Sequence, residues 1–145
     1  MKKYCFRLWI FFYLLTVFQP GATLDAAKKS NIAYSIGGTH LIADFYGCTV
    51  PEDVAELEKI FRAAAKEAGA TALEFKAHKF APIGITAFLI LSESHISVHS
   101  YPEEKYAAVD AFTCGAANPQ KAIDYLKRAF KAESVKIIEV KRGQD

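Results

Sequence analysis

The chain has few cysteines, few prolines and glycines, and little net charge. Its three cysteines are too few for a disulfide-rich scaffold of the kind found in small secreted domains. Five prolines and eight glycines among 145 residues, 52% of them hydrophobic, exclude a collagen-like or disordered chain. The length excludes a second full domain, and the sequence contains neither an internal repeat nor a low-complexity tract. One ordinary globular domain is therefore predicted.

The net charge of +2 comes from the first residues of the chain. Lys2, Lys3 and Arg7 all precede the first acidic residue, and without residues 1–24 the net charge changes from +2 to −1. A nucleic-acid-binding protein needs a clustered basic face, which this nearly neutral body lacks. We therefore expect no nucleic-acid partner.

Residues 1–24 have the layout of a secretory signal: a basic start, an apolar run from Leu8 to Phe18, and small residues at its exit. An eleven-residue helix reaches roughly 17 Å, which is short of the ~30 Å hydrocarbon layer of a membrane. The pattern favours a removed leader over a spanning anchor. An unusual extension, a wrongly chosen start codon, or membrane contact through residues 4–18 stays open.

The remaining chain predicts an α+β fold. Residues 25–36 are small and polar, which indicates a linker ahead of a domain spanning residues 37–145. The order β-α-β-β-β-β-α-β predicts a two-layer α/β sandwich, in which two helices cover one face of an antiparallel sheet. The predicted strands are residues 40–46, 72–78, 85–91, 95–100, 106–113 and 135–140, and the predicted helices are residues 51–69 and 119–131.

Local signals set the ends of the two predicted helices. Pro51 suits the first position of a helix, and Gly69 suits its C-terminal cap. Asn118 and Pro119 form the same kind of start for the second helix, which runs to about Lys131. Residues spaced three and four apart are predicted to face the core: Val54, Leu57, Phe61, Ala64 and Ala68 in the first helix, and Ile123, Leu126 and Phe130 in the second.

Residues 85–91 are almost wholly apolar, which is typical of a strand that is covered on both faces or central in a sheet. Polar, reactive side chains follow at once. Ser94 and His99 lie five residues apart, so a straight strand would direct them to opposite faces, unless a turn between Glu93 and His95 intervenes.

Cys114 lies at the end of the next predicted strand. If that strand pairs with the strand that carries His99, the two residues are expected to share a pocket.

Taken alone, these residues favour structural roles. Ser94 and His95 would cap a turn, His99 would be a satisfied core histidine, and Cys114 would pack as a small hydrophobic residue. A nucleophilic pair of Cys114 and His99 is the catalytic alternative. A metal site has less support, because the only spacing of interest joins His95 to His99, about 13 Å apart on a strand. The other two histidines, His40 and His78, add no metal-binding pattern.

Two longer motifs change this balance. Residues 92–103 read Ser-Glu-Ser-His-Ile-Ser-Val-His-Ser-Tyr-Pro-Glu, and residues 106–115 read Tyr-Ala-Ala-Val-Asp-Ala-Phe-Thr-Cys-Gly. Together they closely resemble the short prokaryotic type of S-adenosylmethionine decarboxylase. The resemblance extends to residues 40–48, 78–84 and 142–143, and so covers most of the body of the chain.

The resemblance implies a proenzyme that cuts itself between Glu93 and Ser94. Ser94 then becomes a covalent pyruvoyl group, the Schiff-base site for the substrate, so that neither pyridoxal phosphate nor a metal is needed. The mature protein would consist of two chains, residues 1–93 and 94–145. His99 matches the position that accepts a proton during processing, a task that suits an imidazole near neutral pH.

The resemblance also assigns roles to five further residues. Thr86 matches a hydroxyl residue that supports processing. Cys114 matches the proton donor of catalysis, and a thiol is mostly protonated near neutral pH. Phe80 and Tyr101 match the positions that sandwich the adenine, and Glu103 matches an acid near the ribose hydroxyls.

The implied reaction is decarboxylation of S-adenosylmethionine to S-adenosyl-3-(methylthio)propylamine, the aminopropyl donor for spermidine synthesis. The resemblance further implies a homodimer of processed protomers with active sites near the subunit interface. The family works in the cytoplasm, where its substrate is made, whereas the hydrophobic leader leaves membrane tethering or export open.

Two alternatives remain at this stage. The same self-processing fold would serve an arginine or ornithine decarboxylase. A non-enzymatic, exported α+β binding module would instead use a disulfide between Cys48 and Cys114, which would remove the thiol proton donor.

Overall fold

The computed structural model describes residues 37–143. The predicted leader and linker therefore lie outside the described residues. The elements, in chain order, are β1 (Gly38–Tyr46), α1 (Val54–Glu67), β2 (Ala72–Lys79), β3 (Ile85–Leu91), β4 (Ser94–Tyr101), the 3-10 turn η1 (Pro102–Glu104), β5 (Tyr106–Cys114), α2 (Pro119–Ala129) and β6 (Ser134–Arg142). The predicted order of strands and helices is confirmed.

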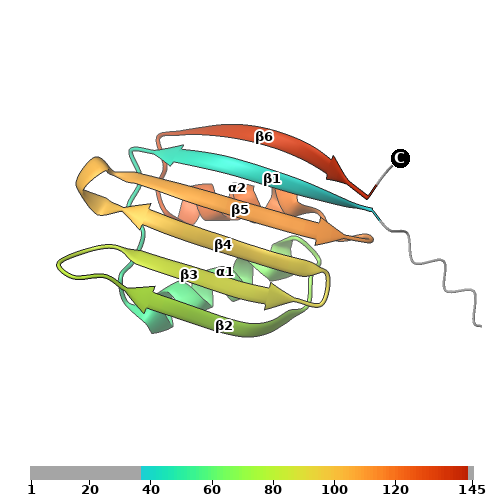
Figure 1. The fold of residues 1–145 in the computed structure, drawn as a ribbon, viewed down its shortest axis with the longest axis horizontal. Coiled ribbons are helices and arrows are strands. Elements are labelled where there is room, and N and C mark those ends of the chain that lie inside the picture. Colours follow the sequence, from blue (N-terminus) through green and yellow to red (C-terminus); the bar gives the residue numbers. More distant parts are fainter. Residues whose placement is uncertain (1–36, 144–145) are drawn as a thin grey trace, which may run out of the picture. The chain divides into compact units, whose positions relative to one another are not determined.

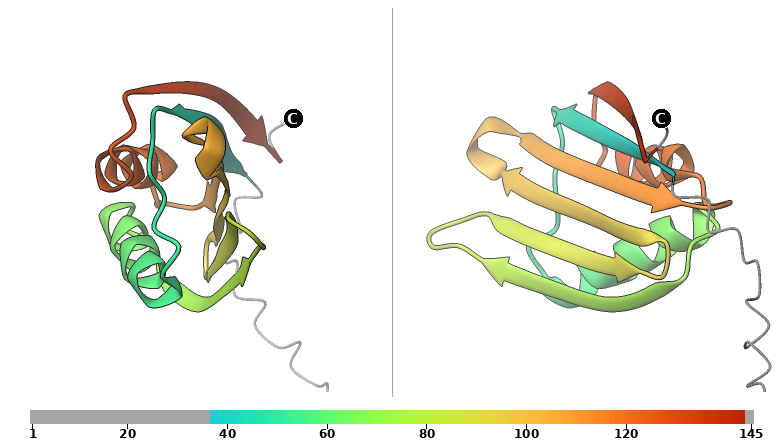
Figure 2. Two further views of the ribbon diagram at one scale, coloured as in Figure 1. Left: turned by 90° about the vertical axis from the view of Figure 1, so that its left-hand side faces the viewer. Right: turned by 45° about the vertical axis from the view of Figure 1, so that its right-hand side comes forward.

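All six strands form one antiparallel sheet in the order β2-β3-β4-β5-β1-β6. The helices α1 and α2 lie side by side against one face of this sheet, as Figures 1 and 2 show. Helix α1 packs on β2 and β3, and α2 packs on β1 and β5. The predicted α+β two-layer sandwich is therefore confirmed.

Helix α1 begins three residues later than predicted. The Asp53 side chain accepts the main-chain N–H of Glu56 at 2.8 Å and so caps the first turn. A capping side chain stabilises a helix that begins just after it, which outweighs the preference of Pro51 for a first position. The C-cap residue is Ala68, and Gly69 follows it with a φ of 71°, the left-handed conformation in which glycine ends a helix. Val54 lies in the first turn and is 39% exposed, so its predicted inward position is wrong.

The core fills the space between the helices and the sheet. Phe45, Phe61 and Phe130 are its largest fully buried side chains. The other predicted inward residues of the two helices are also buried: Leu57, Ala64, Ala68, Ile123 and Leu126. Asn118 caps α2 as predicted, and the helix ends at Ala129, two residues before the expected end.

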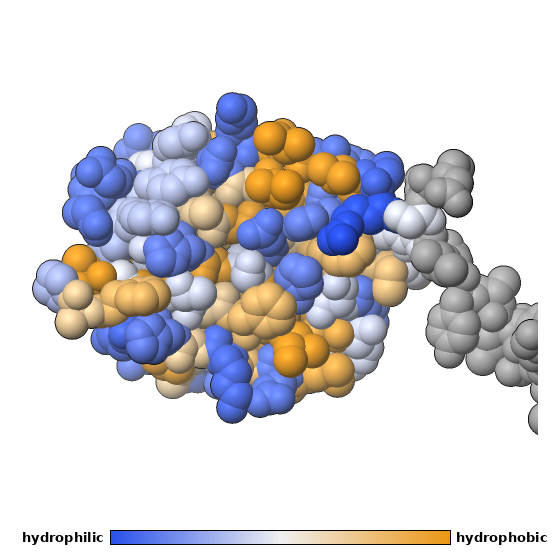
Figure 3. Space-filling view, viewed as in Figure 1, coloured by the Kyte–Doolittle hydropathy of each residue, from blue (hydrophilic) through white to orange (hydrophobic). Residues whose placement is uncertain are grey.

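The second face of the sheet, here called the open face, is covered by no helix of residues 37–143. Figure 3 views the molecule from this side and shows apolar patches among polar residues. Strand β3 lies next to the edge strand β2 and pairs on both sides, but only its helix-facing side is covered, so the alternative of cover on both faces is wrong. Large apolar residues along the open face are 38–52% exposed: Ile42, Tyr46, Phe88, Ile90, Tyr101, Ile138 and Val140. Neither α1 nor α2 is long and apolar enough to cross a membrane.

We expect Phe61→Ala to lower the free energy of unfolding by about 3–5 kcal/mol, because it removes a fully buried ring that packs on Phe75. Urea denaturation, monitored by circular dichroism at one protein concentration, measures the change. Leu73→Ala is the matched control, since Leu73 is 53% exposed and should cost far less. Equal losses in the two variants would contradict this account of the core.

Candidate active site

A two-residue turn, Ser92 and Glu93, joins β3 to β4. The next residue, Ser94, has a φ of 146°, which side-chain-bearing residues rarely adopt. Such a conformation costs of order 1–3 kcal/mol and persists only where the surrounding structure enforces it. The strain falls beside the peptide bond that the sequence predicts to break.

The carbonyl oxygen of Glu93 accepts a hydrogen bond from the main-chain N–H of Cys114 at 3.0 Å. Cys114 is the last residue of β5, and β5 pairs with β4 so that Thr113 lies opposite Ser94. A fixed N–H aimed at a carbonyl oxygen stabilises the negative charge that develops there when a nucleophile attacks the carbonyl carbon. The register of β4 and β5 therefore builds half of an oxyanion hole.

Thr71, in the loop between α1 and β2, anchors the same turn. Its main-chain N–H donates to the Glu93 carboxylate at 2.8 Å, and its hydroxyl donates to the other carboxylate oxygen at 3.3 Å. The carbonyl of Thr71 accepts the N–H of Ser92 at 3.0 Å. Thr71 could not be predicted as a site residue, because no local sequence pattern links it to Glu93, 22 positions away.

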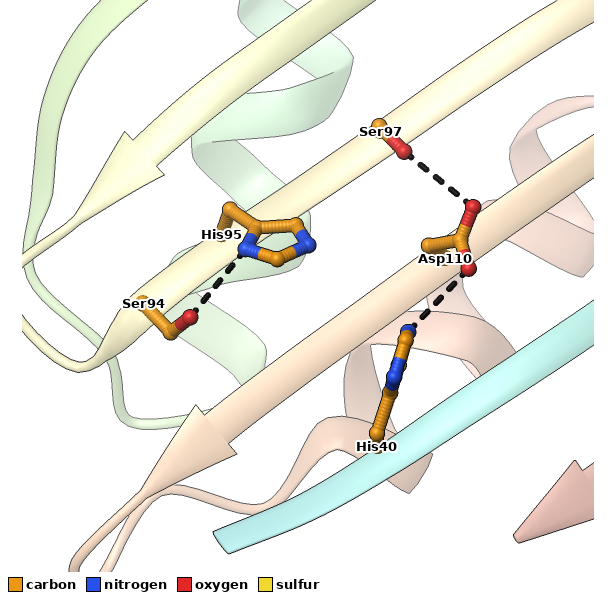
Figure 4. Close-up of polar contacts among 5 residues, drawn as sticks. All are labelled: His40, Ser94, His95, Ser97 and Asp110. Carbon is orange, nitrogen blue, oxygen red and sulfur yellow. Dashed lines mark hydrogen bonds and ion pairs between the residues drawn. The ribbon is translucent and has the colours of Figure 1, made fainter. Parts of the chain in front are cut away.

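The Ser94 hydroxyl is hydrogen-bonded to Nδ1 of His95 at 3.1 Å, as Figure 4 shows. The His95 ring is half-buried on the open face, stacked on Phe88 with ring centroids 5.0 Å apart and edge-on to Phe112 at 5.9 Å. Burial, together with nearby His40, lowers the pKa of His95, while Asp110 opposes this shift.

The remaining predicted residues form a second group on the open face, centred on His99. Nδ1 of His99 and the Thr86 hydroxyl lie 2.5 Å apart and share a hydrogen bond across β3 and β4. The ring centroid of His99 lies 5.6 Å from that of Phe80 and 4.5 Å from that of Tyr101. Glu103 is exposed on η1, two residues beyond Tyr101.

The two groups lie at opposite ends of the sheet. Strands β4 and β5 do pair, but Cys114 lies beside the start of β4, whereas His99 faces Ala108. Five residues of strand separate Ser94 from His99 by about 17 Å. The expectation that His99 and Cys114 share a pocket is therefore wrong within one chain, because antiparallel strands run their residues in opposite directions.

Cys48 and Cys114 are both free, the first buried and the second exposed. Cys48 follows the end of β1, whereas Cys114 pairs with Gly38 at the start of β1. The strand length between them excludes the alternative disulfide. Within residues 37–143, no three His, Cys, Asp or Glu side chains lie close enough to hold a metal ion.

Tyr106 adjoins the His99 group, with its ring centroid 5.6 Å from that of Tyr101. Its hydroxyl donates to the Asp44 carboxylate at 2.6 Å. This hydrogen bond, followed by burial, raises the pKa of Tyr106 to about 12. Tyr106 and Asp44 therefore brace the aromatic residues at this end of the open face.

Comparison with known proteins relates the chain to one enzyme family. Residues 39–143 match the family S-adenosylmethionine decarboxylase. The S-adenosylmethionine decarboxylase proenzyme of Syntrophomonas wolfei is 47% identical over 109 residues, which cover 73% of this chain and 86% of the relative. The proenzyme of Thermosipho melanesiensis is 43% identical over 110 residues, which cover 74% of this chain and 85% of the relative. The crystal structure of the adenosylmethionine decarboxylase from Aquifex aeolicus is similar, with a TM-score of 0.67 and 30% identity over 74% of this chain and 92% of that one.

We expect Asp44→Asn to return the pKa of Tyr106 from about 12 toward the ordinary value of 10.0. The folded chain holds this proton more tightly than the unfolded chain, so the stability it contributes is complete below pH 10 and is lost by about pH 12. Tyrosinate absorbance and urea denaturation across this range measure both effects. Asp124→Asn, on the exposed surface of α2, is the control and should change neither. A Tyr106 titration unaffected by Asp44→Asn would contradict the assigned cause.

Proposed function

The chain belongs to the S-adenosylmethionine decarboxylase family, and from this premise we propose that it cuts its own backbone between Glu93 and Ser94 and then decarboxylates S-adenosylmethionine. One observation carries the proposal. The Glu93 carbonyl accepts the N–H of Cys114, while the adjoining Ser94 is held at φ of 146° with its hydroxyl hydrogen-bonded to an imidazole. A hydroxyl that attacks the carbonyl of the preceding residue needs these groups: a nucleophile held close, a base and an oxyanion donor.

The residues fit the formation of a pyruvoyl group in place of Ser94. Attack of the Ser94 hydroxyl on the Glu93 carbonyl carbon turns the amide into an ester, whose oxygen is the better leaving group. Removal of the α-proton of residue 94 expels the Glu93 carboxylate and leaves dehydroalanine. Hydrolysis by water then releases ammonia. The products are one chain ending at Glu93 and a second chain whose first residue is the keto acyl group.

The pyruvoyl group supplies the electron sink for decarboxylation, the role that pyridoxal phosphate fills in other decarboxylases. The chain's own residues do the rest. The exposed Cys114 thiol lies next to residue 94 and donates the proton that replaces carbon dioxide. Phe80 and Tyr101 bind the adenine between their rings, and Glu103 accepts hydrogen bonds from the ribose hydroxyls. The product is S-adenosyl-3-(methylthio)propylamine, the aminopropyl donor for spermidine synthesis.

These aromatic side chains favour S-adenosylmethionine over arginine or ornithine as the substrate. Phe80 is 43% exposed and Tyr101 is 41% exposed, so both rings offer free surface to a ligand. Neither arginine nor ornithine carries a flat base that would stack on them. Substrate supply also favours work in the cytoplasm. Membrane contact through residues 4–18 concerns residues outside the described part of the chain.

We propose that the working unit is a homodimer in which two open faces pack together. In one chain, Ser94 and Cys114, which the proposal assigns to backbone cleavage and to protonation of the product, lie about 17 Å from the residues that bind adenine. A two-fold axis that crosses the strands near Ser97, midway between Ser94 and His99, exchanges the two ends of the sheet. His99, Thr86, Phe80, Tyr101 and Glu103 of one protomer would then face residue 94 of its partner.

The open face has the size and composition that such an interface needs. Six strands of about eight residues span about 29 Å by 26 Å, so each protomer would bury on the order of 700 Å², near the 800 Å² per partner typical of stable complexes. Seven large apolar side chains on this face are 38–52% exposed, and exposed apolar residues gathered on one face mark an interaction surface. Dimerisation would also add to the core of a domain this small.

We expect the wild-type chain to separate into two fragments and Ser94→Ala to remain a single inactive chain, because it lacks the hydroxyl nucleophile. Intact mass, with and without a carbonyl-trapping reductant, detects both the cut and the keto group. Ser92→Ala, in the same turn, is the matched control and should cleave. Carbon dioxide release from S-adenosylmethionine, arginine and ornithine then identifies the substrate. A folded wild-type chain that stays whole would refute the proposal.

A shared active site predicts rescue between two inactive variants. We expect co-expressed Ser94→Ala and Phe80→Ala chains to recover about a quarter of the wild-type activity, since half of the dimers are mixed and each mixed dimer has one intact site. The separate variants are the controls, and both should be inactive. If each site used Ser94 and Phe80 of the same chain, the mixture would show no recovery.

A further inference from the structure

We propose that His95 is the general base of the acyl shift that opens the backbone, taking the proton from the Ser94 hydroxyl as it attacks the Glu93 carbonyl. The inference rests on the proposed self-cleavage and goes beyond it, because it assigns the first proton transfer to a residue outside the roles implied by the resemblance. His99 keeps its proposed role in the later removal of the α-proton.

Geometry provides the first support. Nδ1 of His95 lies 3.1 Å from the Ser94 hydroxyl oxygen, within the reach of direct proton transfer. On a straight strand these neighbouring side chains would point to opposite faces, but the φ of 146° at Ser94 breaks the alternation. Figure 4 shows the serine hydroxyl turned toward the ring. The unusual backbone angle therefore brings nucleophile and base together.

The surroundings hold this ring in place. Phe88 stacks on it with an interplanar angle of 22°, while Phe112 and His40 contact its edges with centroids 5.9 and 6.1 Å away. His40 is itself paired with Asp110, its Nε2 lying 3.1 Å from the carboxylate. Contacts from β3, β5 and β1 thus restrain the direction in which Nδ1 points.

The electrostatics keep this imidazole neutral, as a base must be. Burial is the main cause that lowers the pKa of His95 below its ordinary value of 6.5. The charges that act on the ring come from β1, β5 and β6: His40 and Arg142 lower the pKa, and Asp110 raises it. A neutral ring whose Nδ1 accepts the Ser94 hydroxyl carries its own proton on Nε2.

The step needs no additional reactant. The Ser94 oxygen bonds to the Glu93 carbonyl carbon as its proton passes to Nδ1 of His95, and the Cys114 N–H stabilises the oxyanion. When the bond from that carbon to the Ser94 nitrogen breaks, the imidazolium returns the same proton to the nitrogen. An ester and a free amine result, and His95 is neutral again.

Other groups fit this step less well. The Glu93 carboxylate accepts two hydrogen bonds from Thr71, which hold it toward the loop between α1 and β2. His99 of the same chain is about 17 Å from Ser94, and in either protomer its Nδ1 is already hydrogen-bonded to Thr86. His95 is the basic side chain that contacts the attacking oxygen in the described structure.

The test follows the full chain during cell-free synthesis by intact mass. We expect His95→Gln to slow cleavage by about 100-fold or more, the usual loss of a general base. The wild-type cleavage rate should stay constant from neutral pH to below 6.5 and then fall as His95 takes up a proton. The rate of His95→Gln should not show this fall. Added imidazole should accelerate His95→Ala. His78→Gln, the same substitution at a β2 histidine that packs on Phe80 rather than on Ser94 or His95, is the control and should cleave near the wild-type rate.

Hydroxylamine, which cuts esters, locates the blocked step. We expect His99→Ala, stalled after the acyl shift, to be cut by hydroxylamine into fragments 1–93 and 94–145, and His95→Gln to resist it. Circular dichroism confirms that both variants fold. Hydroxylamine cutting of His95→Gln, or cleavage of that variant at the wild-type rate, would overturn the assignment while leaving the proposed self-cleavage intact. A wild-type chain that never cleaves would refute the proposed function itself.

Discussion

The hydrogen bond from the Cys114 main-chain N–H to the Glu93 carbonyl ties the end of β5 to the turn between β3 and β4. It exists only in one register of these strands, in which Thr113 faces Ser94. A shift by one residue would turn every side chain of a strand to the other face and expose the core. The apolar packing under α1 and α2 therefore fixes the position of this donor, so that core stability and backbone chemistry depend on the same alignment.

The open face carries two groups of predicted site residues, one at each end of the sheet. Antiparallel pairing places Ser94 and Cys114 at one end and His99 with its aromatic neighbours at the other. In the proposed dimer, a two-fold axis across the strands would bring the two groups together in one active site. The exposed apolar residues would then form the interface and exclude water from it, which would strengthen the polar interactions inside.

The sequence predicted the strands and the inward faces of the helices, because alternation and three-to-four spacing report burial directly. It misplaced the start of α1, where the Asp53 cap outweighed Pro51. It also missed what depends on distant contacts or on one unusual backbone angle. Thr71 meets Glu93 only in the folded chain, and the φ of 146° that turns Ser94 toward His95 leaves no signal in the sequence. The motifs predicted which residues are reactive. Only the structure showed that these residues lie at two opposite ends of the sheet.

The proposed break lies in a turn, where cutting the backbone removes no strand pairing. Strand β3 pairs with β2 as well as β4, and β4 pairs with β5 as well as β3. Cutting the turn between β3 and β4 therefore leaves all of these strand pairings in place. The two hydrogen bonds from Thr71 hold the Glu93 side chain at the new chain end. Meanwhile residue 94 loses its tetrahedral α-carbon and, with it, the strain of a φ of 146°. Strain relief favours the cut, and the sheet keeps the two new ends close enough to form one site.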